Sequence, residues 1–164
     1  MWRLKDIALI ESKEALKAIP EGKVLINTIN AHSYNVAQKD DAFAEALQRA
    51  GFGVFIMANN HCCDKDRRGI ERTLYVLDSL GLQHLGVYRD TLERDSLYPV
   101  IIDHDGLRVA ILNATYGTNG LPVPRGMYVN MLDTAAICAD IARAKAQQAD
   151  VIIMMPHWGE EYHR

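Results

Sequence analysis

Short apolar runs that alternate with amphipathic helical patterns set the strongest limit on how this chain can fold. The runs lie at residues 23–29, 53–57 and 150–155, and each has the length of a strand rather than of a helix. Helical patterns stand between them, at residues 40–50, 67–80 and 134–148. Apolar strands that alternate with helices are typical of parallel pairing in a covered sheet. The sequence therefore predicts an α/β sandwich with a mixed sheet.

Turn signals complete the predicted element order. The stretch YPVIIDHDGLRVAILNATY is typical of a hairpin, in which Asp105-Gly106 supplies the turn. Residues 117–128 hold three glycines and two prolines, which predicts an irregular loop. A short helix is expected over residues 12–19 and a brief strand over residues 84–87.

The bulk composition is that of an ordinary globular domain. Hydrophobic residues make up 49% of the 164 residues and charged residues 24%, with a formal net charge of −3. This balance gives no reason to expect a nucleic-acid partner. The apolar runs are too short to span a bilayer, and the charged amino terminus does not resemble a secretory signal, so we expect a cytoplasmic protein without a membrane segment.

Polar side chains follow two of the apolar strands. Asn59, Asn60, His61 and Asp64 come after the strand at 53–57, and His157 follows the strand at 150–155. Loops at the carboxyl ends of parallel strands meet at one edge of a sheet, where ligands bind. Side-chain oxygens and imidazole nitrogens are ligands of divalent transition metals, so the pattern predicts a metal site.

A structural interpretation of the same residues stays open. Asp64 has the position of a residue that caps the helix expected from Arg67. A histidine beside an apolar strand is often a hydrogen-bonded structural residue. Cys62 and Cys63 are interpreted as packing residues, because three cysteines, two of them adjacent, form no pattern of a disulfide framework.

Several motifs, in order, resemble a known family. They are a strand followed by ANNH, an aspartate three residues after that histidine, GxxxTLxxL, a hairpin, YGTNG, and a late strand that ends in HWGEEY. Over about residues 50–162 the chain resembles the poly-γ-glutamate capsule synthesis (CapA-like) family, which is similar to the calcineurin-like metallophosphoesterases. The resemblance implies a partial metallophosphoesterase-like α/β sandwich, truncated at its C-terminal side.

The resemblance also implies roles for single residues. Asn60 and His157 match metal ligands of Mn, Fe or Zn. His61 matches the histidine that faces the phosphate and protonates a leaving oxygen, and Asp64 matches the aspartate that orients this imidazole. The expected substrate is a phosphoester or an anionic polymer. Three further residues match positions that face the substrate, namely Asn119, Glu160 and Glu161.

Some ligands of the family pattern have no counterpart in this sequence. The family opens with a strand that ends in Gly-Asp, and no such pair occurs here. An expected strand-end glutamate is absent from residues 26–30, and the family's His-x-His pair would lie beyond Arg164. Two readings follow, a metal-dependent phosphoesterase-like enzyme with an incomplete site, and a non-catalytic binding or scaffold fragment.

The first fifty residues allow a third reading. Residues 22–47 weakly resemble the opening of TagA-type glycosyltransferases, with Thr28 and Asn30 at the matching positions. Residues 1–50 are accordingly expected to be either a divergent or a foreign βα unit, joined to a CapA-like core over residues 51–164. We also expect the strand at 150–155 to leave a sheet edge exposed, which favours self-association.

Overall fold

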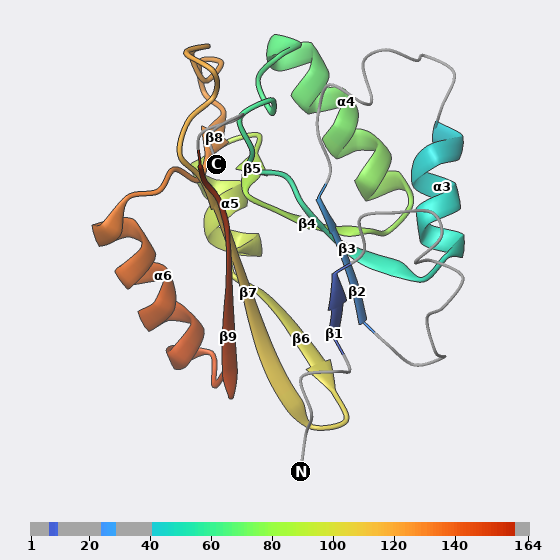
Figure 1. Ribbon diagram of the computed structural model, residues 1–164, viewed down its shortest axis with the longest axis vertical. Coiled ribbons are helices and arrows are strands. Elements are labelled where there is room, and N and C mark those ends of the chain that lie inside the picture. Colours follow the sequence, from blue (N-terminus) through green and yellow to red (C-terminus); the bar gives the residue numbers. More distant parts are fainter. Residues whose placement is uncertain (1–6, 10–23, 29–40, 160–164) are drawn as a thin grey trace.

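A computed structural model describes residues 7–9, 24–28 and 41–159 of the chain. The helix predicted over residues 12–19 lies outside these residues. The described elements form two main sheets with helices on their outer sides (Figure 1). The prediction of an α/β sandwich is thereby confirmed.

The first sheet contains four parallel strands in the order β1-β2-β3-β4. The bounds of these strands are β1 Ile7–Leu9, β2 Val24–Thr28, β3 Phe52–Ile56 and β4 Gln83–Leu85. The strands predicted at 23–29 and 53–57 are therefore present, whereas β1 was not predicted. Because all four strands are parallel, their carboxyl ends lie at one edge of the sheet.

Helices α3 (Asp41–Arg49) and α4 (Asp66–Ser79) cover one face of the first sheet. Leu47 of α3 and Ile70 of α4 pack with Phe55 of β3 in one buried apolar cluster. Phe52 belongs to the same cluster, although residues three apart in a regular strand lie on opposite faces. The pairing of β2 with β3 shifts register at this point and leaves Gly53 as an extra, bulged residue, which brings Phe52 to the face of Phe55.

The second sheet has the order β6-β7-β9 and is mixed. Strands β6 (Val100–His104) and β7 (Leu107–Thr115) are antiparallel, and β9 (Val151–His157) runs parallel to β7. The predicted hairpin is confirmed, and both residues of its turn, Asp105 and Gly106, have positive φ angles, as a two-residue hairpin turn requires.

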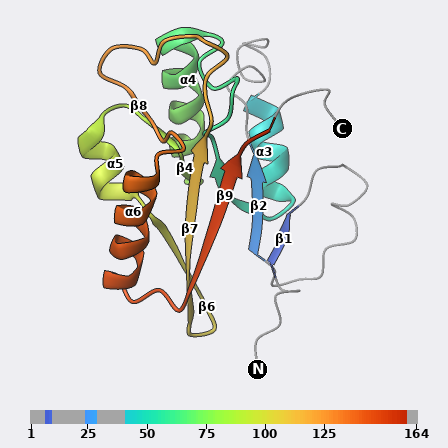
Figure 2. The ribbon, with the colours of Figure 1, turned by 60° about the vertical axis from the view of Figure 1, so that its left-hand side comes forward.

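The two sheets pack face to face and enclose a second apolar cluster. Val54 and Leu85 of the first sheet meet Val100 and Ile111 of the second in this cluster. Helix α6 (Thr134–Ala146) lies on the outer side of the second sheet, and its side chain Ile141 packs against the same cluster (Figure 2). Asp133 caps this helix, since its carboxylate accepts the Ala136 N–H. The described layers are therefore helix, sheet, sheet, helix.

The strand predicted at 84–87 is wrong in one respect. Gly86, with a φ of 101°, interrupts it, so that β4 ends at Leu85 and β5 (Val87–Tyr88) pairs instead with β8 (Tyr128–Val129). Helix α5 (Thr91–Leu97), capped by the Asp90 side chain, was not predicted. In the chain order β5 and α5 lie between β4 and β6, and β8 lies between β7 and β9. The loop at 117–127, which precedes β8, lies beside α4, where Arg67 donates to the Arg125 carbonyl.

Within the described residues, no helix is long and apolar enough to cross a membrane.

Candidate functional site at the carboxyl ends of strands β3 and β9

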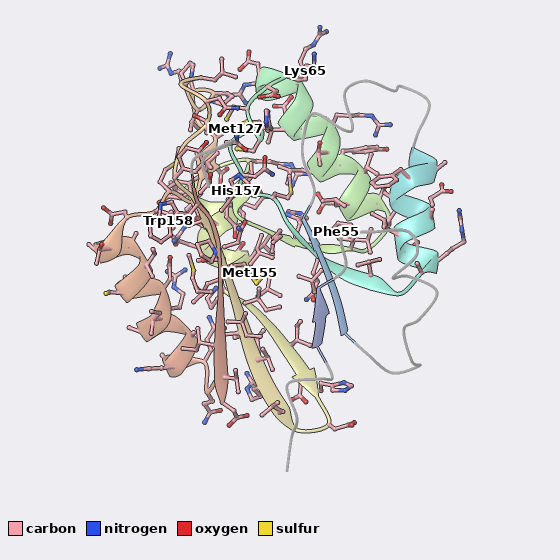
Figure 3. All side chains as sticks on the ribbon, viewed as in Figure 1. Phe55, Lys65, Met127, Met155, His157 and Trp158 are labelled. Atoms are coloured by element: carbon pink, nitrogen blue, oxygen red, sulfur yellow. The ribbon has the colours of Figure 1, made fainter. Side chains whose placement is uncertain are left out.

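The carboxyl ends of β3 and β9 bring the two polar loops together. In the register of the second sheet, Asn113 pairs with Met155 and Thr115 with His157. Residues two apart along a strand share a face, so His157 lies on the same face as Asn113, whose side chain contacts Ala58 at the end of β3. Figure 3 shows His157 at the upper end of β9, on the same side of the molecule as the start of α4 at Lys65.

The loop after β3 is held by its own hydrogen bonds. The Asn59 side chain accepts the His61 N–H at 2.9 Å and donates to the Met57 carbonyl at 3.0 Å. This arrangement is an Asx turn, in which the side chain replaces a backbone partner. Asn59 is only 2% exposed, so its amide stabilises the loop and is not presented to solvent.

Five of the predicted site residues form one chain of contacts. The His157 ring donates to Asn60 Oδ1 at 2.9 Å, and Asn60 Nδ2 donates to Asn119 Oδ1 at 3.1 Å. The Asn119 amide nitrogen then lies 3.4 Å from His61 Nδ1, and Asp64 Oδ2 lies 2.8 Å from the same ring nitrogen. Residues from three separate loops thus meet at one edge of the sandwich.

The short contact with Asp64 decides which nitrogen of His61 carries a proton. A carboxylate accepts only, so His61 donates its Nδ1 proton to Asp64, and this contact fixes the orientation of the ring. The Asn119 amide nitrogen, 3.4 Å from Nδ1, then lies near the ring without forming a second strong hydrogen bond. The His61 side chain is 39% exposed and that of Asp64 18%, so the ring reaches solvent while its partner is mostly covered.

The alternative prediction that Asp64 caps the next helix is wrong. Helix α4 begins at Asp66, its N-cap residue is Lys65, and no side chain caps it. The Asp64 carboxylate contacts the His61 ring instead. The positive φ of Asp66 turns the chain sharply between the loop and the helix, which removes Asp64 from the capping position.

A buried asparagine that sequence reasoning missed connects the two sheets at the site. Asn113 of β7 is 1% exposed. Its side chain accepts the Ala58 N–H at 2.7 Å and donates to the Met155 carbonyl at 2.9 Å. The Tyr98 hydroxyl accepts the Asn113 N–H, and burial raises the pKa of Tyr98 so that it stays protonated. The signal in the sequence was a lone amide inside the apolar strand VAILNAT.

Gly86 and Asn130 extend this support. A Cβ atom at Gly86 would overlap Asn113 Oδ1 and lie 2.7 Å from the Ala58 nitrogen, so only glycine fits there. Asn130 donates to the Asn113 carbonyl at 3.0 Å and accepts from Arg94. Arg94 in turn contacts both carboxylate oxygens of Asp140, at 2.7 and 2.8 Å.

Two thiols lie inside the loop that carries Asn60 and His61. Cys62 and Cys63 are 1% and 3% exposed and belong to the apolar cluster under α4, which confirms their interpretation as packing residues. Their sulfurs are 3.8 Å apart. The contact with Cys63, together with burial, raises the pKa of Cys62, and the hydrogen bond from Cys62 lowers the pKa of Cys63.

The donor atoms near His157 fit part of a metal site. Two donors that each lie about 2.1 Å from one cation, at right angles, are about 3 Å apart. Asn60 Oδ1 and His157 Nε2, at 2.9 Å, have this separation. Among the residues described, no group of three or more His, Cys, Asp or Glu side chains is close enough to hold a metal. The two donors therefore fit one edge of a coordination sphere without completing it.

Two predicted substrate-facing residues, Glu160 and Glu161, lie outside the described residues, as do residues 29–40, which follow β2. Asn119 is placed beside His61 and Asn60, with a positive φ of 52° in the loop 117–127. Tyr116, at the end of β7, lies roughly parallel to the His157 ring at a centroid distance of 6.1 Å.

The fold and this edge define a class of protein, namely an α/β sandwich with a polar, hydrogen-bonded site across the carboxyl ends of two facing sheets. The family described as "Bacterial capsule synthesis protein PGA_cap" matches residues 20–164, and the chain belongs to that family. It is also 26% identical, over 123 residues, to the capsule biosynthesis protein CapA of Bacillus anthracis. That alignment covers 72% of this chain and 29% of the CapA sequence.

The match also bears on how the first residues are read. It begins at residue 20 and so includes residues 22–47, where a glycosyltransferase-like opening was considered. In the structure β2 pairs directly with β3, within one sheet. The division of the chain at residue 50 stays a prediction.

Proposed function

We propose that this capsule synthesis protein carries a metal-dependent, phosphoesterase-like site at the carboxyl ends of β3 and β9. The observation that supports the proposal best is the chain of contacts from Asp64 through His61, Asn119 and Asn60 to His157. Residues 97 positions apart in the sequence meet there with the donor types that such a site needs.

Asn60 and His157 would hold the cation, which is Mn, Fe or Zn in this proposal. When bound, such an ion polarises a phosphoryl oxygen and stabilises a leaving oxygen. The amide oxygen of Asn60 is oriented by its own Nδ2, which donates to Asn119. His157 is oriented by the register of β9 and by the ring of Tyr116. Asn60 is only 3% exposed, so it is held in a fixed position.

His61 would transfer a proton to the leaving oxygen of the substrate. Asp64 accepts the Nδ1 hydrogen bond and so fixes the ring orientation. In the imidazolium form Nε2 carries the second ring proton, and this is the proton that it would donate to the leaving oxygen. The partial exposure of the His61 ring places this nitrogen where a substrate can reach it. Asp64 acts through His61 and is therefore a positioning residue.

The substrate proposed is a phosphoester or an anionic polymer. Lys65, Arg67 and Arg68 are exposed at the start of α4, directly after the site loop. Arg67 also donates to the Arg125 carbonyl, which joins α4 to the loop that carries Asn119. Three acidic residues in the same stretch balance these three positive charges, namely Asp64, Asp66 and Glu71. The anionic substrate is therefore proposed from the cation that the site would hold, and the side chains at the start of α4 would assist as hydrogen-bond donors.

A second candidate function is binding without catalysis. The observation that favours it is the donor set, because the described residues supply two ligands and not the three or more that hold a catalytic metal. In this case the loop presents an anion-binding or partner-binding surface and produces no turnover.

Thermal unfolding of metal-stripped protein, with and without Mn²⁺, distinguishes these functions. A ligand that binds only the native state raises the free energy of unfolding by about 2.7 kcal/mol at one hundred times its dissociation constant. We expect a clear upward shift in the wild-type protein, which is lost in Asn60→Ala and in His157→Ala. Hydrolysis of a chromogenic phosphoester is then measured on the same samples.

His104→Ala is the matched control, because His104 ends β6 at the hairpin, away from the two loops. This variant should keep the Mn²⁺ shift. A shift without hydrolysis supports the binding function, and a shift that survives in Asn60→Ala and His157→Ala contradicts the proposed ligands. Absence of any shift in well-folded wild type contradicts a metal site formed by this chain.

A further inference from the structure

Two consecutive buried cysteines lie inside the site loop and have no part in the proposed function. Cys62 and Cys63 separate Asn60 and His61 from Asp64 in the sequence. Their sulfurs are 3.8 Å apart, in van der Waals contact. The third cysteine, Cys138, is exposed on α6, on the outer side of the other sheet. A vicinal dithiol at this position has a chemistry of its own.

We propose that Cys62 and Cys63 are a redox-modification site, at which a small peroxide converts the two thiols into a vicinal disulfide. One thiolate sulfur attacks a peroxide oxygen, the O–O bond breaks, and a sulfenic acid and a hydroxide form. The second sulfur then attacks the sulfenic sulfur and displaces a hydroxide. The two thiol protons and the two hydroxides give two waters, so hydrogen peroxide gains the two electrons that the thiols lose.

The separation of the sulfurs favours this pairing over any other. A disulfide requires a sulfur–sulfur distance of about 2.05 Å, so each sulfur has to move by roughly 1 Å. Cys138, being exposed on the far side of the second sheet, cannot compete for either thiol within one molecule. Once a sulfenic acid forms at one cysteine, the neighbouring thiol is already in contact with it.

A peroxide reaches these buried sulfurs only when the loop opens locally. The loop is held by the Asx turn of Asn59 and by backbone bonds from the Cys62 N–H to the Asn59 carbonyl and from the Asp64 N–H to the His61 carbonyl, both at 3.2 Å. These bonds lie outside the regular helix, so their opening does not require that of α4. Hydrogen peroxide needs a smaller opening than a bulky disulfide reagent, which should therefore react far more slowly.

Closure of the disulfide would disturb the neighbouring contact of His61 with Asp64. These two residues flank the thiol pair directly, and their ring-to-carboxylate distance is 2.8 Å. Because only one peptide unit lies between the two cysteines, the backbone has to rotate when the sulfurs join, and Asp64 moves with it. The modification itself is independent of the proposed function, whereas an effect on proton transfer by His61 rests on that function.

The test uses the full chain with Cys138→Ser, which removes the exposed thiol and thus any intermolecular disulfide. Reduced protein is treated with hydrogen peroxide, unfolded in the presence of an alkylating agent, digested and analysed by mass spectrometry. We expect the peptide with Cys62 and Cys63 to lose about 2 Da, to resist alkylation, and to recover both thiols after dithiothreitol. Cys62→Ser and Cys63→Ser, each in the same background, should give no such product.

Three results would overturn the proposal. One is that both thiols remain open to alkylation after peroxide. Another is that only sulfinic or sulfonic acid forms. The last is that the disulfide appears in protein unfolded before treatment and not in native protein, since the native contact would then be irrelevant.

The effect of the disulfide on the loop is measured by the NMR signals of the His61 ring. These signals should shift on oxidation and return on reduction, and unchanged signals would contradict an effect on the His61–Asp64 contact. If reduced protein fails to bind Mn²⁺, the proposed metal site is contradicted. The mass and NMR measurements still test the proposed disulfide in that case.

Discussion

At the scale of one residue, Asn113 joins the two strands β3 and β9, whose carboxyl ends carry the site. Its amide contacts the backbone of Ala58 after β3 and of Met155 in β9. Asn113→Ala leaves these buried backbone groups without partners, and each such loss costs about 1–3 kcal/mol. We expect the free energy of unfolding, measured with urea, to fall by about 3 kcal/mol. Gln83→Ala, which removes an exposed amide side chain from β4, is the control and should change stability little.

Gly86 should tolerate no side chain. Gly86→Ala combines a positive φ with an overlap between the new methyl group and the Asn113 amide, so we expect a loss of more than about 2 kcal/mol in the free energy of unfolding. Gly81→Ala is the matched control, because its φ of 66° is also positive but nothing lies within 4 Å of the added atom. Equal losses in both variants would mean that backbone strain alone explains the effect.

The sequence predicted the site residues whose chemical type and position after a strand both indicate a site. His61, Asp64, Asn60 and His157 stand at or after the ends of apolar strands, and they were predicted to meet at one edge of a common mixed sheet. The structure brings them together, but β3 and β9 belong to different sheets, and their loops meet because the two sheets face each other. Their roles stay predictions. Asn113 was not predicted, because the partner atoms of a buried amide belong to backbone far away in the sequence and leave no local pattern.

At the scale of secondary-structure elements, a mostly buried ion pair joins helices α5 and α6. The side chains of Arg94 and Asp140 are 11% and 9% exposed. Removal of one partner of a buried pair leaves an uncompensated charge and costs about 3–5 kcal/mol. We expect a loss in this range for Asp140→Ala, measured by urea unfolding.

Asp95→Ala is the matched control for this pair. Asp95 also lies near Arg94, at 3.6 Å, but its side chain is 56% exposed, so we expect a change below about 1 kcal/mol. A small loss in Asp140→Ala would mean that water or another side chain replaces the carboxylate. Helices α5 and α6 would then be joined mainly through Arg143, which donates to the Asp95 carboxylate at 3.1 Å and to the Tyr98 carbonyl at 3.2 Å.

Long elements followed from the sequence and short ones did not. Helix α4 and the β6-β7 hairpin have clear apolar periodicity and turn residues, and both were predicted within two residues of their bounds. Helix α5 buries none of its residues, so it has no apolar face to recognise. Strands β5 and β8 have two residues each, and their pairing depends on Gly86 and on a loop that joins distant parts of the chain.

At the scale of the whole molecule, strand β9 is the feature from which we expect self-association of this chain. Among the described strands, β9 pairs with β7 on one side and lies last in the order of its sheet, and its residues from Val151 to Met155 are half-buried. An apolar edge strand is a template for pairing with another chain. We expect sedimentation velocity to show self-association that increases with protein concentration.

Val151→Lys should weaken this association, because a lysine on an edge strand opposes pairing. Phe43→Lys is the control, since Phe43 is 45% exposed on α3, on the opposite side of the molecule. A monomer at all concentrations, with a sharp and concentration-independent melt, would contradict the expectation.

The bond between His157 and Asn60 joins residues that are 97 positions apart. During synthesis on the ribosome, the loop after β3 and its covering helix α4 emerge well before β9 does. Contacts between distant positions form slowly and late, after local ones. Until β9 docks, a nascent chain has a formed first sheet but no Asn60–His157 contact, so the proposed metal would meet only one of its two ligands. Binding of that metal would thus report that β9 has docked on the site loop.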